Sequence, residues 1–208
     1  MARNDLFTTV HKGIRAALFD SVREAARADY RDSESTQRVV LAVRQLLELL
    51  EEHARAEDAV IFPEVEKLGP AVYADLHGDH LRIGGLQTEI GQLLDRVIAS
   101  EGTERESLGA RLHEKLGRLA AEHLLHMERE ETVANRLLRA HKTDDELIAM
   151  RVTILRSIEP LALTRWAGAL LPEISPVERA GFLAGLQKLL PAELYETIPA
   201  SMREATFA

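Results

Sequence analysis

The chain of 208 residues contains no cysteine. Disulfides, thiolate zinc sites, iron–sulfur clusters and cysteine nucleophiles are therefore excluded, and any bound metal must be held by histidine, aspartate, glutamate or backbone oxygen. Aromatic residues are scarce as well, at 4% of the chain, and clusters of β-branched residues are short. Because no convincing alternating strand pattern is found, the composition and periodicity predict an all-α fold.

An excess of positive charge and a long apolar run are also missing. The formal net charge of −8 argues against partners that attract lysine and arginine, namely nucleic acid and anionic membrane surfaces. No uncharged apolar run approaches the ~18 residues that a membrane span requires. The segment MARNDLFTTVHKG at the start lacks the apolar core of a signal peptide. We therefore expect a cytoplasmic protein that binds neither nucleic acid nor membrane.

Helical periodicity extends over almost the whole chain and is interrupted by polar or glycine-containing breaks. These breaks predict four long helices, over about residues 4–30, 36–67, 71–100 and 104–140. Pro63 is expected to bend the second helix or to end its regular part. Four long helices joined by short turns form an up-down-up-down four-helix bundle. We therefore assign residues 1–141 to a bundle domain and residues 142–208 to an extension of shorter helices.

The C-terminal extension contains the segment Ser175-Pro176-Val177-Glu178, a capping box that predicts the start of a helix. The extension has no histidine, and we assign it no chemistry. Its apolar side chains need a surface to pack on, and a homodimer formed through these helices is one arrangement that supplies it. These side chains are Trp166, Leu170, Leu171, Phe182, Leu186 and Leu189.

A pattern of polar residues recurs on the predicted apolar faces of the bundle, where an unpartnered polar group is costly. It reads His…His-x3-Glu and occurs twice, once in each predicted helical hairpin. The two histidines of a copy are 42 residues apart in the first hairpin and 46 in the second, and the glutamate follows by one helical turn. The pattern comprises His11, His53, Glu57, His80, His126 and Glu130.

Packing the two hairpins together brings four imidazoles and two carboxylates into the bundle core. Four neutral nitrogen donors with two carboxylates suit two divalent transition ions bridged by the glutamates. Magnesium and calcium prefer all-oxygen sites, and a structural zinc site has four ligands that are often thiolates. A ferritin-like site needs a glutamate three residues before a histidine, and none of the histidines has an acidic residue there.

Residues next to this pattern leave alternatives open. Glu131 is a rival for the second bridging position. His77 and His123 each lie three residues before a predicted ligand, and each is either a replacement ligand, a hydrogen-bond partner of a ligand, or a histidine outside the site. Tyr73 lies on the same face of the third helix as the predicted ligand. It is either a phenol that contacts the site or a core tyrosine.

As an ordered set, these residues resemble the hemerythrin family, specifically its HHE cation-binding, hemerythrin-like domains. The resemblance covers about residues 5–140. It implies a non-haem di-iron centre with an oxo or hydroxo bridge, in which the six residues of the recurring pattern are the iron ligands. It rests on His11, His53-x3-Glu57 with the following Val60-Ile61-Phe62-Pro63, Asp79-His80 and His126-Met127-x-x-Glu130-Glu131.

The chain departs from the oxygen carriers of this family, which have a second histidine one turn from the third-helix ligand. In this chain, the positions four residues before and after His80 are Leu76 and Gly84. The chain is instead similar to the His–HxxxE–His–HxxxE subgroup, as in mycobacterial hemerythrin-like proteins. This resemblance implies a protein that binds peroxide, O2 or nitric oxide and protects against oxidative or nitrosative stress with catalase-like redox activity. The alternative it leaves open is an iron or oxygen sensor, or a storage protein, without turnover.

Overall fold

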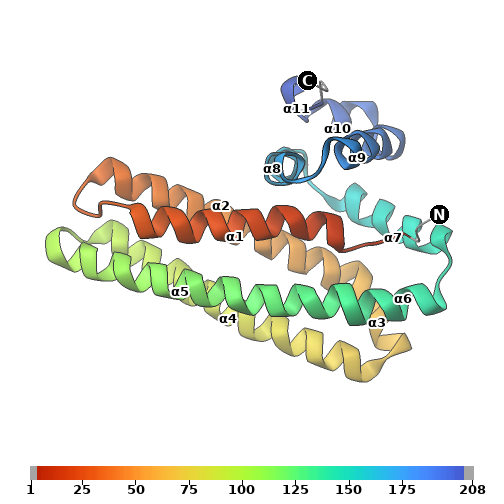
Figure 1. Cartoon of the computed structure of the whole chain (residues 1–208), viewed down its shortest axis with the longest axis horizontal. Helices are drawn as coiled ribbons and strands as arrows, with labels where there is room; N and C mark the ends of the chain where they lie inside the picture. Colours follow the sequence, from red (N-terminus) through yellow and green to blue (C-terminus); the bar gives the residue numbers. More distant parts are fainter. Residues whose placement is uncertain (1–3, 204–208) are drawn as a thin grey trace.

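The computed structural model describes residues 4–203, and its helices follow the predicted order (Figure 1). Two single π-helical turns continue the second and fourth long helices without a break. No strand occurs among the described residues, so the predicted all-α class is confirmed. The elements of the bundle are α1 (Thr8–Arg27), α2 (Ser33–Ala56), η1 (Glu57–Ile61), α3 (Phe62–Leu68), α4 (Pro70–Ala99), α5 (Gly102–Arg129), η2 (Glu130–Ala134) and α6 (Asn135–His141).

The long helices form the predicted antiparallel bundle. Helix α1 packs between α2 and α5, and α4 packs between the same two helices on the other side, which closes a ring of four. The largest hydrophobic cluster fills the space between them and includes Ile14, Val43, Ile90 and Leu112, all fully buried. Within residues 4–203, no helix combines the length and the apolar character of a membrane span.

The second helix begins earlier than predicted. The polar segment after Asp32 was expected to be a turn, but the helix starts at Ser33 because the Asp32 side chain accepts a hydrogen bond from the backbone N–H of Ser35. At the other end, Pro63 lies in the first turn of α3, directly after η1, and the chain stays helical to Leu68. Proline has no N–H to donate, which suits a position where the regular hydrogen-bond ladder is already interrupted.

The π-helical turn η2 changes which residues of the fourth helix face the core. An uninterrupted α-helical stripe predicts that Val133 and Leu137 are inside, but Val133 is 41% exposed and Leu137 is only partly buried. Ala134 and Leu138 are fully buried instead. A π turn adds one residue to the helix, so the apolar stripe continues one position later. The stripe expected of a regular α-helix therefore does not continue beyond Glu130.

The C-terminal helices lie on the α1–α2 side of the bundle, away from α4 (Figure 1). The predicted capping box of Ser175 and Glu178 is confirmed at the start of α9, and a second one, formed by Thr143 and Glu146, starts α7. The apolar side chains of the extension pack on α1 and on one another; association of two copies stays a prediction. The elements are α7 (Asp144–Ser157), α8 (Pro160–Leu170), η3 (Leu171–Glu173), α9 (Pro176–Leu189), α10 (Ala192–Glu196) and α11 (Ala200–Arg203).

Candidate metal centre

The structure brings the six residues of the recurring pattern together in the middle of the bundle. Each long helix supplies a histidine, and the two glutamates stand at the first position of the π turns η1 and η2. Their side chains are almost completely withdrawn from solvent. The exposed fractions of the side chains are 0% for His11, 7% for His53, 3% for Glu57, 8% for His80, 1% for His126 and 0% for Glu130.

The donor atoms fall into two groups that share both glutamates. One group consists of His11 and His53 with the two carboxylates, and the other of His80 and His126 with the same carboxylates. Within each group, one ligand atom from each of the four residues lies within 4.8 Å of all the others. Each group therefore offers two imidazole nitrogens and two carboxylate oxygens to one ion.

Glu57 faces both groups with different oxygens. Its Oε1 lies 3.2 Å from His53 Nε2 and 3.9 Å from His11 Nε2. Its Oε2 lies 3.5 Å from His80 Nε2. One carboxylate thus spans the two positions, which is the arrangement of a bridging ligand.

Glu130 spans the same two positions from the opposite hairpin. Its Oε2 lies 3.4 Å from His11 Nε2, and its Oε1 lies 3.3 Å from His126 Nε2. The structure therefore gives Glu130 the same relation to the two groups as Glu57, in agreement with the internal repeat of the sequence.

These donor atoms have the unmet bonding capacity that a metal site requires. Both oxygens of Glu57 and of Glu130, together with Nε2 of His11 and of His53, are buried and have no hydrogen-bond partner among residues 4–203. Buried polar atoms are almost always paired in native proteins, so a cluster of unpaired ones indicates a missing partner. Metal ions in both groups would satisfy all of these atoms at once, and the residues present therefore fit two ions.

The second pair of histidines has the separation expected of two ligands on one ion. The Nε2 atoms of His80 and His126 lie 3.0 Å apart. Two nitrogens at the usual metal–imidazole distance of about 2.1 Å, bound at right angles, are separated by about 3 Å. Without an ion, one of these nitrogens must carry a hydrogen and donate it to the other.

Three histidines of the site, His11, His53 and His80, have pKa values far from the ordinary histidine value. Burial opposes the protonation of His11, but its hydrogen bond to Glu131 and the carboxylates of the site prevail and raise its pKa to about 9. Burial likewise opposes the protonation of His80, where the carboxylates of Asp58 and Glu57 raise the pKa to about 10. Burial lowers the pKa of His53 to about 3. Protons on His11 and His80 thus balance part of the negative charge that metal ions would otherwise neutralise.

The pKa values of the two carboxylates shared by the donor groups are shifted in opposite directions. Burial and the charge of Glu57 raise the pKa of Glu130. Burial also acts to raise the pKa of Glu57, but the neighbouring histidines, His53 first, hold it well below its usual value. The pKa values of two carboxylates in one buried site move apart in this way, because the site cannot easily hold both carboxylates in ionised form.

Three of the four histidines have a carboxylate at Nδ1, the ring atom that points away from the centre. Nδ1 lies 2.8 Å from Glu131 in His11, 3.0 Å from Asp58 in His80 and 3.4 Å from Asp79 in His126. Such carboxylates fix the orientation of a metal-binding imidazole and raise its basicity. These contacts leave Nε2 of each of the three rings directed at the shared carboxylates of Glu57 and Glu130.

The remaining candidates lie outside both groups. His77 stacks on Tyr73, with ring centroids 5.4 Å apart, and Tyr73 meets Phe62 edge-on at 6.2 Å. Phe62 in turn stacks on the predicted ligand His80 at 4.6 Å, so Tyr73 belongs to the aromatic packing beside the centre. His123 is 3% exposed, and neither of its ring nitrogens has a hydrogen-bond partner among the described residues.

A family comparison covers the segment that forms this centre. The model of the hemerythrin HHE cation-binding domain matches residues 3–138. The chain belongs to this family. A search of curated proteins and a search of solved structures give no match. The hemerythrin domain thus covers α1 to α6 almost completely, while α7 to α11 lie beyond the matched segment, and the cation binding for which the family is described agrees with the two donor groups.

Two residues of the hemerythrin centre were missed by sequence reasoning. Asp58 was given no role, and Asp79 was noted only as part of a motif, yet each contacts a histidine predicted to be a ligand. The available signal was adjacency, because Asp58 follows Glu57 and Asp79 precedes His80. Asp79 is only 3% exposed and is held by Arg82 and Arg129, contacts that the sequence alone does not indicate.

Proposed function

We propose that this hemerythrin-family protein binds two iron ions, linked by an oxo or hydroxo bridge, and reacts there with small oxidants such as peroxide, O2 or nitric oxide. The observation that carries the proposal is the convergence of buried, unpartnered donor atoms into two groups that share Glu57 and Glu130. Two imidazoles with carboxylates and open coordination positions are a donor set typical of non-haem iron. A pair of such ions changes oxidation state readily, which supplies the chemistry for reducing a peroxide or binding a gas.

The residues of the chain hold the proposed ligands in position and keep water out of the centre. Asp58, Asp79 and Glu131 hold three imidazoles so that Nε2 faces the ions. Each group has four protein donors, so positions remain for a bridge and for an exogenous ligand. Gly84 is one of the two positions, with Leu76, that lie one turn from His80 and lack the further histidine of the oxygen carriers, and a Cβ at Gly84 would meet no atom within 4 Å. The open space and the missing ligand support access by an oxidant from the α4 side.

The test is iron content and an optical spectrum before and after addition of peroxide. We expect two irons per chain, a charge-transfer band of a bridged ferric pair, and evolution of O2 from peroxide. Glu57→Ala is expected to lower the content below one iron, because this carboxylate serves both groups. Glu51→Ala removes an exposed glutamate of the same helix and is expected to keep two irons and full activity. One iron or none in the unmodified protein, after loading with excess ferrous iron, contradicts the proposal.

One observation favours the alternative of an iron sensor without turnover. Six buried atoms on four predicted ligands have no hydrogen-bond partner within the described part of the chain. Iron would remove this cost, so iron occupancy is expected to stabilise the bundle strongly. A sensor is indicated if chelation unfolds helices, seen as a loss of circular dichroism, while the loaded protein consumes no more than stoichiometric peroxide. Repeated turnover by a protein that stays folded without iron indicates the enzyme.

A further inference from the structure

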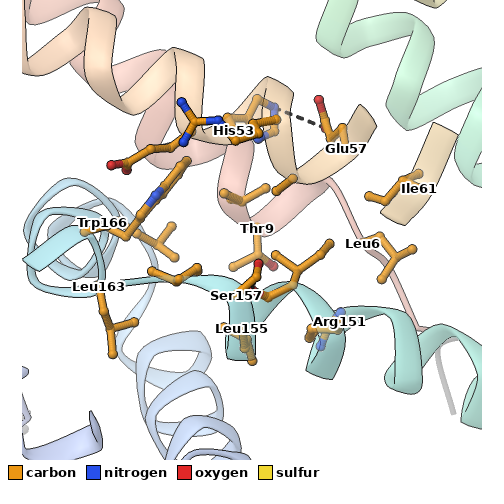
Figure 2. A pocket seen from close by; sticks show the side chains of 18 of the residues that line it. Leu6, Thr9, His53, Glu57, Ile61, Arg151, Leu155, Ser157, Leu163 and Trp166 are labelled. Atoms are coloured by element: carbon orange, nitrogen blue, oxygen red, sulfur yellow. Dashed lines mark hydrogen bonds and ion pairs between the residues drawn. The ribbon is translucent and has the colours of Figure 1, made fainter. Parts of the chain in front are cut away.

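A pocket of about 380 Å³ lies between the hemerythrin bundle and the C-terminal helices. Its volume is within the ~300–1,000 Å³ range of small-molecule sites. The wall is mostly apolar and combines residues of α1, α2, η1, α7, α8 and α9. Figure 2 shows Thr9 and Leu6 from the bundle on one side and Leu155, Leu163 and Trp166 from the extension on the other. The extension, which has no histidine of its own, therefore completes a cavity.

The inner end of this pocket lies next to the candidate metal centre. His53 and Glu57 both belong to its lining, and they are joined by the 3.2 Å contact drawn in Figure 2. The ring of Trp166 lies 6.1 Å from the ring of His53, which lies 5.2 Å from the ring of His11. A molecule in the pocket would therefore approach the group formed by His11 and His53.

The imidazole of His53 is held differently from the other three on this side of the centre. His11, His80 and His126 each have a carboxylate at Nδ1, whereas no hydrogen bond of His53 Nδ1 is found among the described residues. Apolar side chains of the extension stand there in place of an acid. An apolar wall holds water poorly and favours an apolar occupant.

The extension is fixed to the bundle, so the pocket exists before any ligand binds. Helix α8 approaches α1 so closely at Gly13 that a Cβ there would lie 2.9 Å from the carbonyl oxygen of Ala169. Arg165 of α8 pairs with Glu52 of α2 at 2.6 Å, and Lys12 of α1 pairs with Glu178 of α9 at 2.5 Å. A preformed site loses little free energy to ordering when it binds a ligand.

We propose that this pocket binds an alkyl molecule with one terminal oxygen group, such as a medium-chain carboxylic acid or alkyl hydroperoxide, with the oxygen end at His53 and Glu57. The apolar wall accommodates the alkyl chain, and the metal centre accommodates the oxygen end. This orientation rests on the metal centre of the proposed function. The C-terminal helices then select organic substrates or ligands for the hemerythrin centre, in addition to small inorganic oxidants.

The first test uses Trp166, the single tryptophan of the chain, as a reporter. Alkanoic acids from four to twelve carbons are titrated into the metal-free, full-length protein while Trp166 fluorescence is recorded, and calorimetry provides independent dissociation constants. Affinity is expected to rise up to about fourfold per added methylene, as for full burial of each group, and to level off once the pocket is filled. An affinity that does not change with chain length overturns the proposal.

A matched pair of variants locates the site. Ser157 lines the pocket from the end of α7, and its hydroxyl donates to the carbonyl of Ile154 at 2.8 Å. Thr153 makes the same kind of bond one turn earlier, to Ala149 at 3.0 Å, but does not line the pocket. Both are exposed, so either can carry a phenylalanine without repacking a core. Ser157→Phe is expected to weaken decanoic acid binding at least tenfold, and Thr153→Phe less than twofold.

Equal binding by both variants, with unchanged circular dichroism, places the ligand elsewhere and overturns the proposal. Ala162→Phe, which fills the pocket from α8, provides a second variant if Ser157→Phe misfolds, with the same expected loss.

The orientation is tested with cobalt(II) in the metal centre, read by its visible absorption. Decanoic acid is expected to change both the cobalt spectrum and Trp166 fluorescence. A change in fluorescence alone contradicts the orientation, because the oxygen end is then away from the metal. Two bound cobalt ions with no response of either signal to decanoic acid overturn the pocket and leave the proposed function intact. Failure to bind cobalt or iron, with the fluorescence response retained, overturns the metal centre instead.

Discussion

Replacing His123 by leucine is expected to stabilise the metal-free protein. His123 lies on α5 one turn before His126, is 3% exposed, and has no hydrogen-bond partner at either ring nitrogen among the described residues. A buried polar group without a partner costs about 1–3 kcal/mol. Leucine has a similar volume and forms helices more readily. We therefore expect the free energy of unfolding to rise by about 1–3 kcal/mol at pH 7.5.

The gain in the free energy of unfolding from His123→Leu is expected to grow as the pH falls. Burial, and then the charges of nearby histidines, lower the pKa of His123 to about 3 in the folded protein, whereas an unfolded chain has a pKa of about 6.5. Below pH 6.5 the unfolded state therefore binds a proton that the folded state does not, and the stability of the unmodified protein falls by up to about 1.4 kcal/mol per pH unit. At pH 5.5 the leucine variant avoids a loss of about 1.4 kcal/mol.

Urea unfolding of the metal-free proteins at pH 7.5 and 5.5, followed by circular dichroism, measures both effects. His113→Leu is the matched control, because His113 is an exposed histidine on the same helix, and it should change stability little at either pH. The leucine variant of His123 should also keep two irons per chain, since His123 belongs to neither donor group. A destabilised variant, or a gain that does not depend on pH, shows that the imidazole has a partner and refutes the reasoning.

Three further predictions concern the centre and its surroundings. Glu131→Gln should keep two irons but bind them about 10- to 100-fold more weakly in a chelator competition, because Glu131 only orients His11; loss of an iron makes it a ligand. Gly13→Ala should lower the free energy of unfolding in urea by about 1–3 kcal/mol, because the added Cβ meets the backbone of α8. The added Cβ of Gly117→Ala meets no atom within 4 Å, so this variant should raise the free energy of unfolding by about 1 kcal/mol. Metal loading at pH 7.5 should release about two protons, from His11 and His80, because their pKa values are about 9 and 10. The affinity for metal should therefore rise up to ~100-fold per pH unit below pH 9. Release of less than one proton, measured with a pH indicator in weak buffer, contradicts this prediction.

The fold was predictable because its determinants are local and repeated. Apolar residues at helical spacing recur over four long segments, and short polar or glycine-containing breaks leave antiparallel packing as the simple arrangement. The capping box at Ser175 was also predictable, since it depends on residues three positions apart. The start of α2 was less clear, because Asp32 and the serines after it are typical of both a turn and an N-cap.

The π-helical turns were not predictable in the same way. Pro63 marks the neighbourhood of the first, but the second, at Glu130–Ala134, has no proline. A π turn costs helical regularity and is retained because of the packing and ligand positions it allows, which depend on all four helices together. The pocket beside His53 escaped prediction for a related reason. Its wall combines residues more than a hundred positions apart, and the extension that contributes half of it has no residue suggestive of chemistry.

The choice between Glu130 and Glu131 shows what the structure adds to the sequence motif. Consecutive helical residues point about 100° apart, and the two glutamates meet opposite edges of one imidazole. Glu130 is fully buried and lies 3.4 Å from His11 Nε2, while Glu131 lies 2.8 Å from His11 Nδ1 and also pairs with Arg15. A Glu131 oxygen already shared by Arg15 and by the outer nitrogen of His11 cannot also bridge two ions on the inner side of that imidazole. The adjacent acids therefore have complementary positions: Glu130 faces both donor groups, and Glu131 orients the His11 imidazole, which in the proposed di-iron centre would bind one ion.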